Sequence, residues 1–399
     1  MGVIKALDGN AAIAHGVMRS KVQLVAAYPI TPQTPIVETI ASLIDRKEYD
    51  ATYITAESEH SALSAIVGAS STGVRTFTAS ASHGLALMHE LTGVTSASRL
   101  PAVMAVVSRA IPGPMALWCD HSDIMTQRDQ GWIQLFAKSP QEALDFTMIA
   151  YRVSEDPRVL IPTMVDIDGF FCSHLTEPVN VPTEEEAERF IQEFKCVNAH
   201  LDTDMPYAMN NLTSPGIFTE IKKSQDIGMR SAAKVLDERF EEFGELFGRK
   251  YGRIMCDGVE GADTVLLCMG SMAGTAKHVV QQLRKDGKKV GLCRVATFRP
   301  FPTKEVAAAL QDAKNVAVID RVSAMGSFGP LYEEVLAALN YGGIRANTYN
   351  YVAGLGGRDI WEQTIENVIA KAEELAAKGV RCEEPIWIDL KEEEVVYNA

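Results

Sequence analysis

The sequence predicts an α/β protein built from doubly wound parallel sheets, on two observations. From residue 9 to about 170, short apolar runs rich in Val, Ile and Ala alternate with longer amphipathic stretches, and a second alternating region follows residue 255. The chain has 399 residues, of which 47% are hydrophobic and 23% charged, so it can fill a sizeable core. We therefore expect two or three domains, roughly one per 150 residues.

The first alternating region is expected to form one doubly wound domain. Its strands are predicted at 22–28, 51–55, 75–79, 101–107, 132–137 and 159–165. Helices are predicted between them at 35–46, 58–70, 84–97 and 140–154. Continuous apolar runs are typical of parallel strands that helices cover on both faces.

The alternation stops near residue 175, where prolines and acidic residues interrupt it. A polar, irregular stretch with Pro206 and Pro215 is expected to lie over a surface, and a helix is expected at about 227–248. A second, smaller α/β domain should then contain strands at 263–268, 289–294 and 316–320 and helices near 272–285, 303–312 and 328–340. The predicted divisions are 1–175, a connector and linking helix at 176–254, a domain at 255–385 and a tail at 386–399.

Charge and composition exclude several classes of protein. The 38 Lys and Arg against 52 Asp and Glu give a formal charge of 38 − 52 = −14, which argues against nucleic acid and against a polybasic membrane anchor. No signal peptide is visible, and the apolar runs are shorter than the ~20 residues that span a bilayer, so a cytoplasmic protein is expected. The 7 cysteines include no C-x-x-C pair, so no zinc or iron-sulfur site is expected within this chain.

The first of three unusual loops runs from Tyr28 to Pro35, after the first core strand. In it Thr31 stands between two prolines, Thr34 can cap the next helix, and Pro35 suits the first helical position. A rigid strand-to-helix turn explains this pattern, and so does a ligand site, because ligands of parallel α/β sheets bind beyond the carboxyl ends of the strands.

The second loop carries an acidic residue at a helix start. Ser58 can cap a helix, and Glu59 falls in its first turn, where the helix dipole stabilises a carboxylate. Plain helix capping is one interpretation. The other is a Glu that faces a ligand nitrogen inside a pocket.

The third loop is the longest, from Ser108 to Trp132. Arg109 ends an apolar strand, and its guanidinium needs a partner, which is either a substrate carboxylate or an ion pair with one of three acids on the loop: Asp120, Asp123 or Asp129. The run Asp-His-Ser-Asp at 120–123 has no recognised metal-ligand spacing, so no metal site is predicted there.

Other motifs are weaker. Glycines at 354–357 and at 270–274 could cradle a phosphate, but tight turns produce such glycines more often. There is no P-loop, G-x-S-x-G or H-E-x-x-H motif in the sequence, so nucleotide hydrolysis, serine hydrolysis and zinc proteolysis have no support.

At these loops the sequence resembles the α subunits of 2-oxoacid:ferredoxin oxidoreductases, most closely those of the pyruvate type. The matching segments lie at 27–32 (AYPITP), 57–62 (ESEHSA), 76–80 (TFTAS), 84–90 (GLALMHE), 109–110 (RA), 127–134 (QRDQGWIQ), 168–170 (DGF), 173–174 (SH), 298–302 (FRPFP) and 353–359 (AGLGGRD). They span nearly the whole chain in order, which is more specific than any one motif.

The resemblance implies a thiamin diphosphate enzyme divided over several subunits. The region 1–175 would be the pyrimidine-binding domain and 255–385 a transketolase C-terminal-like domain. A β subunit would bind the diphosphate and Mg²⁺, and γ and δ-type subunits, one of them ferredoxin-like, would carry [4Fe-4S] clusters. The implied reaction is the reversible, coenzyme A-dependent oxidative decarboxylation of pyruvate to acetyl-CoA and CO₂, with reduction of ferredoxin.

The resemblance also implies roles for residues of the three loops and of the β-strand end near 80. Glu59 would hydrogen-bond the aminopyrimidine ring of the cofactor, and Thr31 and Arg109 would hold the substrate. The other implied cofactor contacts are Pro29, Ile30, Ser82 and His83. His83 and the segment 111–116 depart from the pyruvate-type pattern, so branched-chain 2-oxoacids or oxalate are alternative substrates, and a noncatalytic scaffold subunit is an alternative of another class.

Overall fold

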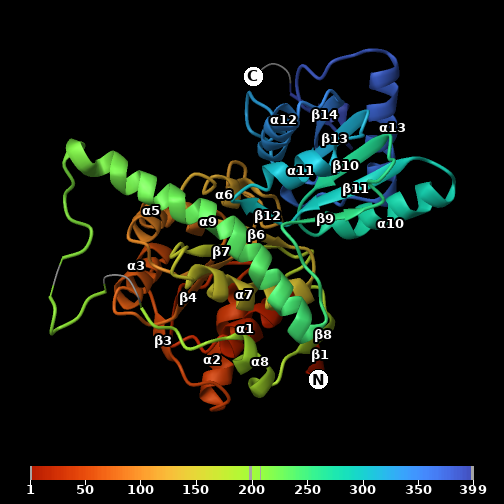
Figure 1. Ribbon diagram of the computed structural model, residues 1–399. Coiled ribbons are helices and arrows are strands. Elements are labelled where there is room, and N and C mark those ends of the chain that lie inside the picture. The colour runs from red at the N-terminus through yellow and green to blue at the C-terminus, as the bar shows by residue number, and fades with distance from the viewer. Residues whose placement is uncertain (1, 197–199, 207, 397–399) are drawn as a thin grey trace. The chain divides into compact units, whose positions relative to one another are not determined.

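The computed structural model describes residues 2–196, 200–206 and 208–396, and the chain folds into two compact units (Figure 1). The first unit comprises Met1–Arg253 and Ala296–Pro302. The second comprises Ile254–Val295 and Thr303–Ala399. Both units are α/β structures with a mainly parallel sheet, which confirms the predicted fold class.

The sheet of the first unit has seven strands in the order β12-β6-β7-β5-β4-β2-β3. All neighbouring pairs are parallel except β12 with β6. The strands are β2 (Leu24–Ala27), β3 (Thr52–Thr55), β4 (Thr76–Ser80), β5 (Val103–Ser108), β6 (Ile133–Ala137), β7 (Thr163–Asp168) and β12 (Thr297–Arg299). The six strands predicted for the first region are confirmed, with ends displaced by a few residues.

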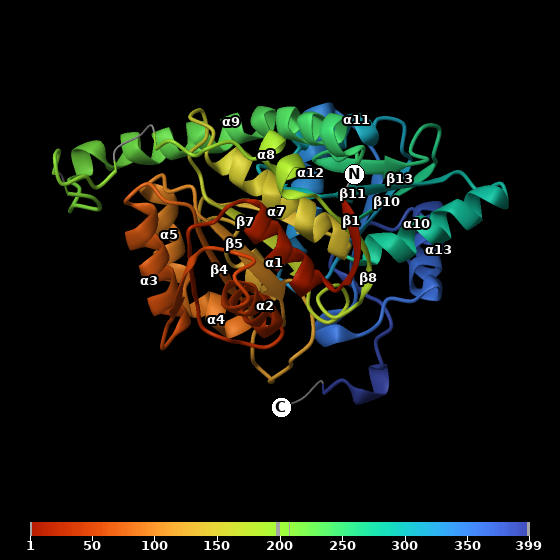
Figure 2. The ribbon, with the colours of Figure 1, turned by 90° about the horizontal axis from the view of Figure 1, so that it is seen from below.

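Helices cover this sheet on both faces. They are α1 (Gly9–Arg19), α2 (Thr34–Asp45), α3 (Glu59–Ser70), α4 (Ser82–Leu87), α5 (His89–Ala97), α6 (Ser122–Met125) and α7 (Pro140–Ser154). Figure 2 shows α3 and α5 on one side of the strands and α1 and α7 on the other. The single helix expected at 84–97 is two helices that meet at Met88.

An antiparallel pair outside the main sheet was not predicted. β1 (Val3–Leu7) pairs with β8 (Glu177–Val181), so the start of the chain is fastened to a segment about 170 residues away. The Asp8 carboxylate then caps α1 by accepting a hydrogen bond from the backbone N–H of Ala11 at 2.8 Å. A short helix, α8 (Glu184–Phe190), follows β8.

The long helix α9 (Pro215–Phe247) begins well before the predicted residue 227. Pro215 occupies its first turn, where a missing N–H costs nothing, so this proline starts the helix and does not belong to an irregular stretch as expected. Figures 1 and 2 both show α9 running beside α7, where Phe146 packs on Phe240 with ring centroids 5.9 Å apart. The segment predicted as a separate connector is therefore part of the first unit.

The segment Ala296–Pro302 also belongs to the first unit, although the sequence analysis placed it in the second domain. β12 adds to the edge of the first sheet through antiparallel pairing with β6, as Phe136 N–H donates to the Ala296 carbonyl at 2.8 Å. This exchange joins residues about 160 positions apart, which local periodicity does not reveal.

The second unit holds a six-stranded sheet in the order β15-β14-β13-β10-β11-β9, in which β9 alone is antiparallel. Its strands are β9 (Ile254–Asp257), β10 (Thr264–Cys268), β11 (Val290–Val295), β13 (Asn315–Asp320), β14 (Asn347–Val352) and β15 (Ile386–Trp387). Its helices are α10 (Met272–Lys285), α11 (Thr303–Ala309), α12 (Pro330–Gly342), α13 (Glu362–Ala377) and the short turns η1 (Leu355–Gly357) and η2 (Glu392–Glu394). The three predicted strands and three predicted helices are present, and β9, β14, β15 and α13 were missed.

The glycines at 270 and 354 serve turns of the second unit. Gly270 and Gly354 have φ of 66° and 75°, values that favour glycine, and each follows a strand of the parallel sheet. Among the described helices of both units, α9 included, none has the length and apolar character needed to cross a membrane.

Candidate active site

Five adjacent strands of the first sheet end beside one another, and the predicted site residues follow four of them. In sheet order these strands are β7, β5, β4, β2 and β3. β3 pairs with one side of β2, and the next strand along the chain, β4, pairs with its other side. The strand order therefore reverses at β2. A reversal of this kind opens a crevice beyond the carboxyl ends, where ligands of doubly wound sheets bind.

The loop after β2 is held rigid by buried amides. The Gln33 side chain donates to the Tyr28 carbonyl at 2.8 Å, and the Asn10 side chain donates to the Pro32 carbonyl at 3.0 Å. Thr31 is exposed between them. The expected cap by Thr34 is wrong, because Thr34 is already the first residue of α2, Gln33 precedes it, and no side chain caps this helix.

Glu59 begins α3 and is buried, with 6% of its surface exposed. Ser58 caps the helix as predicted, since its hydroxyl accepts from Ser61 N–H at 3.1 Å. Among the described residues, no side chain or backbone group forms a hydrogen bond or ion pair with the Glu59 carboxylate. Ser58 therefore caps the helix, and the carboxylate oxygens of Glu59 remain available to accept hydrogen bonds from a ligand.

Gly84 of α4 lies directly against Glu59. A methyl group added at Gly84 would overlap the Glu59 Oε1 atom and would lie 2.8 Å from the Ser80 hydroxyl. Glycine at this position therefore lets α4 approach the carboxylate.

The turn between β4 and α4 places the two other predicted cofactor contacts differently. Ser82 is fully buried in the left-handed region at φ 51°, and its hydroxyl donates to the Ala110 carbonyl at 2.6 Å. The backbone N–H of Ser82 donates to Asp123 Oδ2 at 2.7 Å. The His83 side chain is exposed and makes no hydrogen bond within the described part of the chain.

Arg109 is buried, with 3% exposed, and its guanidinium contacts backbone oxygens. Nε donates to the Ala116 carbonyl at 2.9 Å, Nη1 donates to the Thr31 carbonyl at 3.0 Å, and Nη2 lies 3.2 Å from Met115 Sδ. None of the described carboxylates forms an ion pair with it, so the alternative ion pairs with the loop aspartates are wrong. Burial lowers the pKa of Arg109, and the nearby Asp123 opposes this.

Asp123 accepts three backbone hydrogen bonds at this site. Oδ2 accepts from Ser82 N–H at 2.7 Å and from Arg109 N–H at 3.0 Å, and Oδ1 accepts from Ile124 N–H at 2.7 Å. Burial raises the pKa of Asp123 to about 7, although the hydrogen bonds from Ser82 and Arg109 act in the other direction. The sequence analysis considered Asp123 only as an ion-pair partner.

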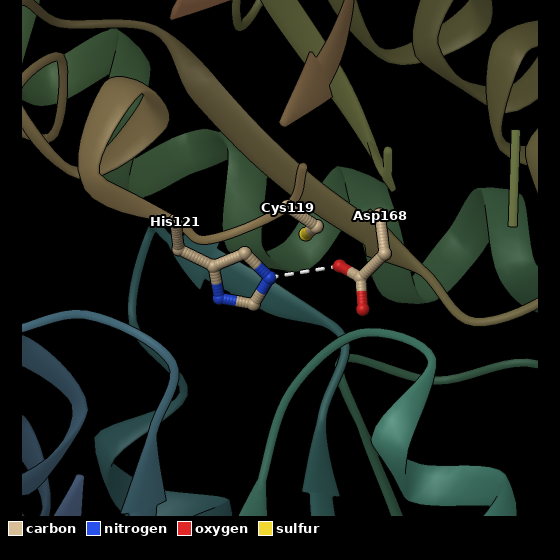
Figure 3. A group of neighbouring side chains, drawn as sticks. All are labelled: Cys119, His121 and Asp168. Atoms are coloured by element: carbon tan, nitrogen blue, oxygen red, sulfur yellow. Dashed lines mark hydrogen bonds and ion pairs between the residues drawn. The ribbon is translucent and has the colours of Figure 1, made fainter. Parts of the chain in front are cut away.

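His121 and Asp168 form a buried pair behind this loop (Figure 3), with His121 Nε2 and Asp168 Oδ1 2.8 Å apart. Together with Cys119 they offer three metal-ligand atoms within 4.8 Å of one another. Two donor atoms of a tetrahedral zinc ion at about 2.0–2.1 Å are about 3.3 Å apart, so the observed distance is that of a hydrogen bond. The pair ties the loop to the end of β7.

Asp166 lies two residues before Asp168 on the same face of β7 and accepts a hydrogen bond from the Ser108 hydroxyl. Burial raises the pKa of Asp166 well above its ordinary value, and His121 opposes this. These acids were missed by the sequence analysis. Two aspartates within an otherwise apolar buried strand are the signal that could have revealed them.

Comparisons with known proteins agree over most of the chain. Residues 15–241 match the family described as "Pyruvate flavodoxin/ferredoxin oxidoreductase, thiamine diP-bdg", and residues 262–365 match "Pyruvate:ferredoxin oxidoreductase core domain II". The pyruvate synthase subunit PorA of Methanocaldococcus jannaschii is 42% identical over 392 residues, which cover 98% of each chain. The PorA subunit of Thermotoga maritima is 43% identical over 92% of this chain and 94% of its own.

Other relatives carry a different substrate in their names. The ketoisovalerate oxidoreductase subunit VorA of Pyrococcus horikoshii is 41% identical over 97% of this chain and 98% of its own. Among solved structures, the 2-oxoglutarate:ferredoxin oxidoreductase of Magnetococcus marinus superposes with a TM-score of 0.71 at 21% identity, over 93% of this chain and 65% of that chain. At that identity the likeness supports the fold alone.

Proposed function

Because the chain belongs to the pyruvate:ferredoxin oxidoreductase family, we propose that the crevice beyond β2, β3, β4 and β5 binds thiamin diphosphate and a 2-oxoacid together. The chain is one subunit of a multisubunit oxidoreductase that acts on 2-oxoacids. The preferred substrate we propose is pyruvate. The observation that carries the site assignment is a buried carboxylate after β3 and a buried guanidinium after β5, both with hydrogen-bonding capacity left over at the same edge of one parallel sheet.

The residues around Glu59 fit the pyrimidine end of the cofactor. A carboxylate that is 6% exposed and lacks a partner in the described structure needs a donor, and an aminopyrimidine supplies one. Glu59 would hold a proton at a ring nitrogen, with Pro29 and Ile30 on one side and the turn of Ser82 and His83 on the other. When bound, the cofactor supplies an electron sink for cleavage of the bond between the carboxylate and the oxo carbon.

Arg109 and Thr31 fit the substrate end. A guanidinium has five N–H groups, and the described contacts of Arg109 occupy three of them. The remaining N–H groups, on Nη1 and Nη2, can bind a carboxylate as a fork. The Thr31 hydroxyl lies on the exposed side of the loop whose carbonyl Arg109 binds, so it is available to the oxo group. Together they would orient the acid for attack.

The remaining chemistry requires other chains. Conversion of pyruvate and coenzyme A into acetyl-CoA, CO₂ and a proton releases two electrons, which two one-electron ferredoxins accept. The seven cysteines are scattered along the sequence with no C-x-x-C pair, so we assign the clusters for these electrons to γ and δ-type partner subunits. A β subunit would bind the diphosphate with Mg²⁺.

The test is to purify the assembled complex without oxygen and to measure ferredoxin reduction with pyruvate and 2-oxoisovalerate in the presence of coenzyme A. Reduction with oxalate is measured without coenzyme A, because oxalate yields two CO₂ and two electrons and leaves no acyl group to transfer. We expect stoichiometric thiamin diphosphate and the highest kcat/KM with pyruvate. A higher kcat/KM with 2-oxoisovalerate or with oxalate would show that this acid, and not pyruvate, is the preferred substrate. The proposed site would then still stand. A complex that contains no thiamin diphosphate and oxidises none of the three acids would support a noncatalytic scaffold.

A further inference from the structure

Two segments of the site meet at one buried carboxylate that the proposed reaction does not use. Asp123 is fully buried in α6, on the long loop after β5. Its carboxylate accepts from the backbone of the β4–α4 turn through Ser82 and from the end of β5 through Arg109. One oxygen atom, Oδ2, makes both contacts.

The contacts join the cofactor side of the crevice to the substrate side. Ser82 precedes Gly84, which lies against Glu59, and Arg109 reaches the loop of Thr31. A further hydrogen bond, from the Ser82 hydroxyl to the Ala110 carbonyl, also joins the β4–α4 turn to the loop after β5. The distance between Glu59 and the Arg109 guanidinium thus depends on how these segments are held.

The backbone at Ser82 requires such support. A serine at φ 51° is strained, and conformations of this kind persist only where the surroundings fix them. The Asp123 carboxylate accepts a hydrogen bond from the Ser82 N–H, and the Ala110 carbonyl accepts one from the Ser82 hydroxyl. The hydrogen bonds of the Asp123 carboxylate in the described structure are therefore made to backbone N–H groups and not to a side-chain cation.

We propose that Asp123 is a positioning residue that sets the separation of the cofactor-binding turn at Ser82 from the substrate-binding Arg109. This inference rests on the proposed function. It predicts that loss of the Asp123 carboxylate lowers the rate of the chemical step in complexes that assemble and bind cofactor normally. Misplacement of reacting groups by about 1 Å can cost about 100-fold in rate.

The test compares Asp123→Leu with Asp120→Leu in the assembled complex. Leucine is close to aspartate in size but has no acceptor, so the N–H groups of Ser82 and Arg109 both lose their partner, whereas asparagine could keep both through its amide oxygen. Asp120 lies on the same loop, and within the described residues its Oδ1 accepts from Ser122 alone, from N–H at 2.9 Å and from the hydroxyl at 2.5 Å. Its hydrogen bonds stay within its own loop, so Asp120→Leu serves as the matched control.

We expect Asp123→Leu to lower kcat per bound thiamin diphosphate by about 10- to 100-fold, with the cofactor Kd changed by less than about threefold. Asp120→Leu should leave both unchanged. A merely structural role for Asp123 would reduce the amount of assembled complex and leave kcat per bound cofactor unchanged, and that result would overturn the inference.

Ser82→Ala provides a second test if Asp123→Leu does not assemble. It removes the bond to Ala110 and keeps the backbone N–H on Asp123, so a smaller loss of kcat, about threefold to tenfold, is expected. Unchanged kcat in Ser82→Ala would then overturn the inference. Failure of the proposed function is distinguishable, because in that case the wild-type complex itself shows no 2-oxoacid-dependent reduction.

Discussion

Asp320 ends β13 in the second unit and is fully buried, much as Glu59 is buried beyond β3 in the first unit. Asp320 Oδ1 accepts from Leu331 N–H at 2.8 Å, and Oδ2 accepts from the Asn350 side chain at 2.9 Å. The carboxylate thus stabilises the first turn of α12. Glu59 has no such contact within the described residues.

The arginines at these strand ends are alike. Arg321 of the second unit is 2% exposed, and its Nε donates to the Gly354 carbonyl at 3.1 Å, where it supports a turn. Arg109 likewise donates to backbone carbonyls, those of Ala116 and Thr31. Burial of a charge at a strand end is therefore no mark of a site by itself. A buried charged group whose hydrogen-bonding atoms are not all used by the fold is the better indication of a ligand site.

The strongest test of this contrast is Glu59→Gln. The amide fills the same space but cannot carry the charge or exchange the proton that we assign to Glu59, so turnover should fall by at least about 100-fold in complexes that still assemble. The measurement is pyruvate-dependent ferredoxin reduction per assembled complex. Glu57→Gln is the control, because Glu57 is exposed on the same loop and its carboxylate accepts from the nearby Ser61 hydroxyl at 2.6 Å. Full turnover in Glu59→Gln would contradict the assignment.

Arg109→Lys tests the substrate side. Lysine keeps the charge but presents a point donor in place of a planar fork, so it should bind the substrate carboxylate less well. Loss of one charge-assisted hydrogen bond corresponds to a fall in kcat/KM for pyruvate of about 10- to 100-fold, mainly through KM. Initial rates over a range of pyruvate concentrations measure this. An unchanged KM would remove Arg109 from the substrate site.

Much of this arrangement was predictable from the sequence. The alternation of apolar runs located the strands at whose ends Arg109, Glu59 and Thr31 lie, because buried parallel strands leave a strong local signal. β1, β8 and β12 were not predictable, since their pairing partners lie about 160 to 170 residues away. The first turns of α9 were missed because Ile217 and Phe218 are more than half exposed and give no buried stripe to recognise.

The sequence predicted which residues lie at the site, but it did not predict the contacts that these residues make. Arg109 was expected to pair with a loop aspartate or a substrate, and the structure gives it the Thr31 and Ala116 carbonyls instead. Backbone acceptors carry no sequence signal. The link of Asp123 to Ser82 and the pair of His121 with Asp168 join residues about 40 positions apart, which no local pattern contains.

Asp320→Asn tests the other half of the comparison. The amide nitrogen cannot accept from the N–H and NH₂ groups that surround it, so a buried donor loses its partner and unfolding should become easier by about 1–3 kcal/mol. Urea unfolding of the purified chain measures this. Turnover per assembled complex should be unchanged, and a loss of turnover without a loss of stability would show that this edge also takes part in catalysis.

The smallest expected effect comes from Gly84→Ala, which alters the site without removing a charge. The added methyl would overlap Glu59 Oε1, so the carboxylate or α4 has to move by a few tenths of an ångström or more. We expect turnover to fall by about tenfold, because small displacements of a positioned group reduce the rate steeply.

Gly68→Ala of α3 is the matched control for this helical glycine, since a methyl there would meet nothing within 4 Å. It should leave turnover unchanged and stabilise the helix by about 0.5–1 kcal/mol. Equal turnover in the two variants would mean that Glu59 tolerates displacement, and the space beside its carboxylate would then not define the geometry of the cofactor. A selective loss in Gly84→Ala would show that α4 sets the position of Glu59. Gly329 of the second unit lies against Asp320 in the same way, but the contacts of Asp320 are structural, so we assign no such role to Gly329.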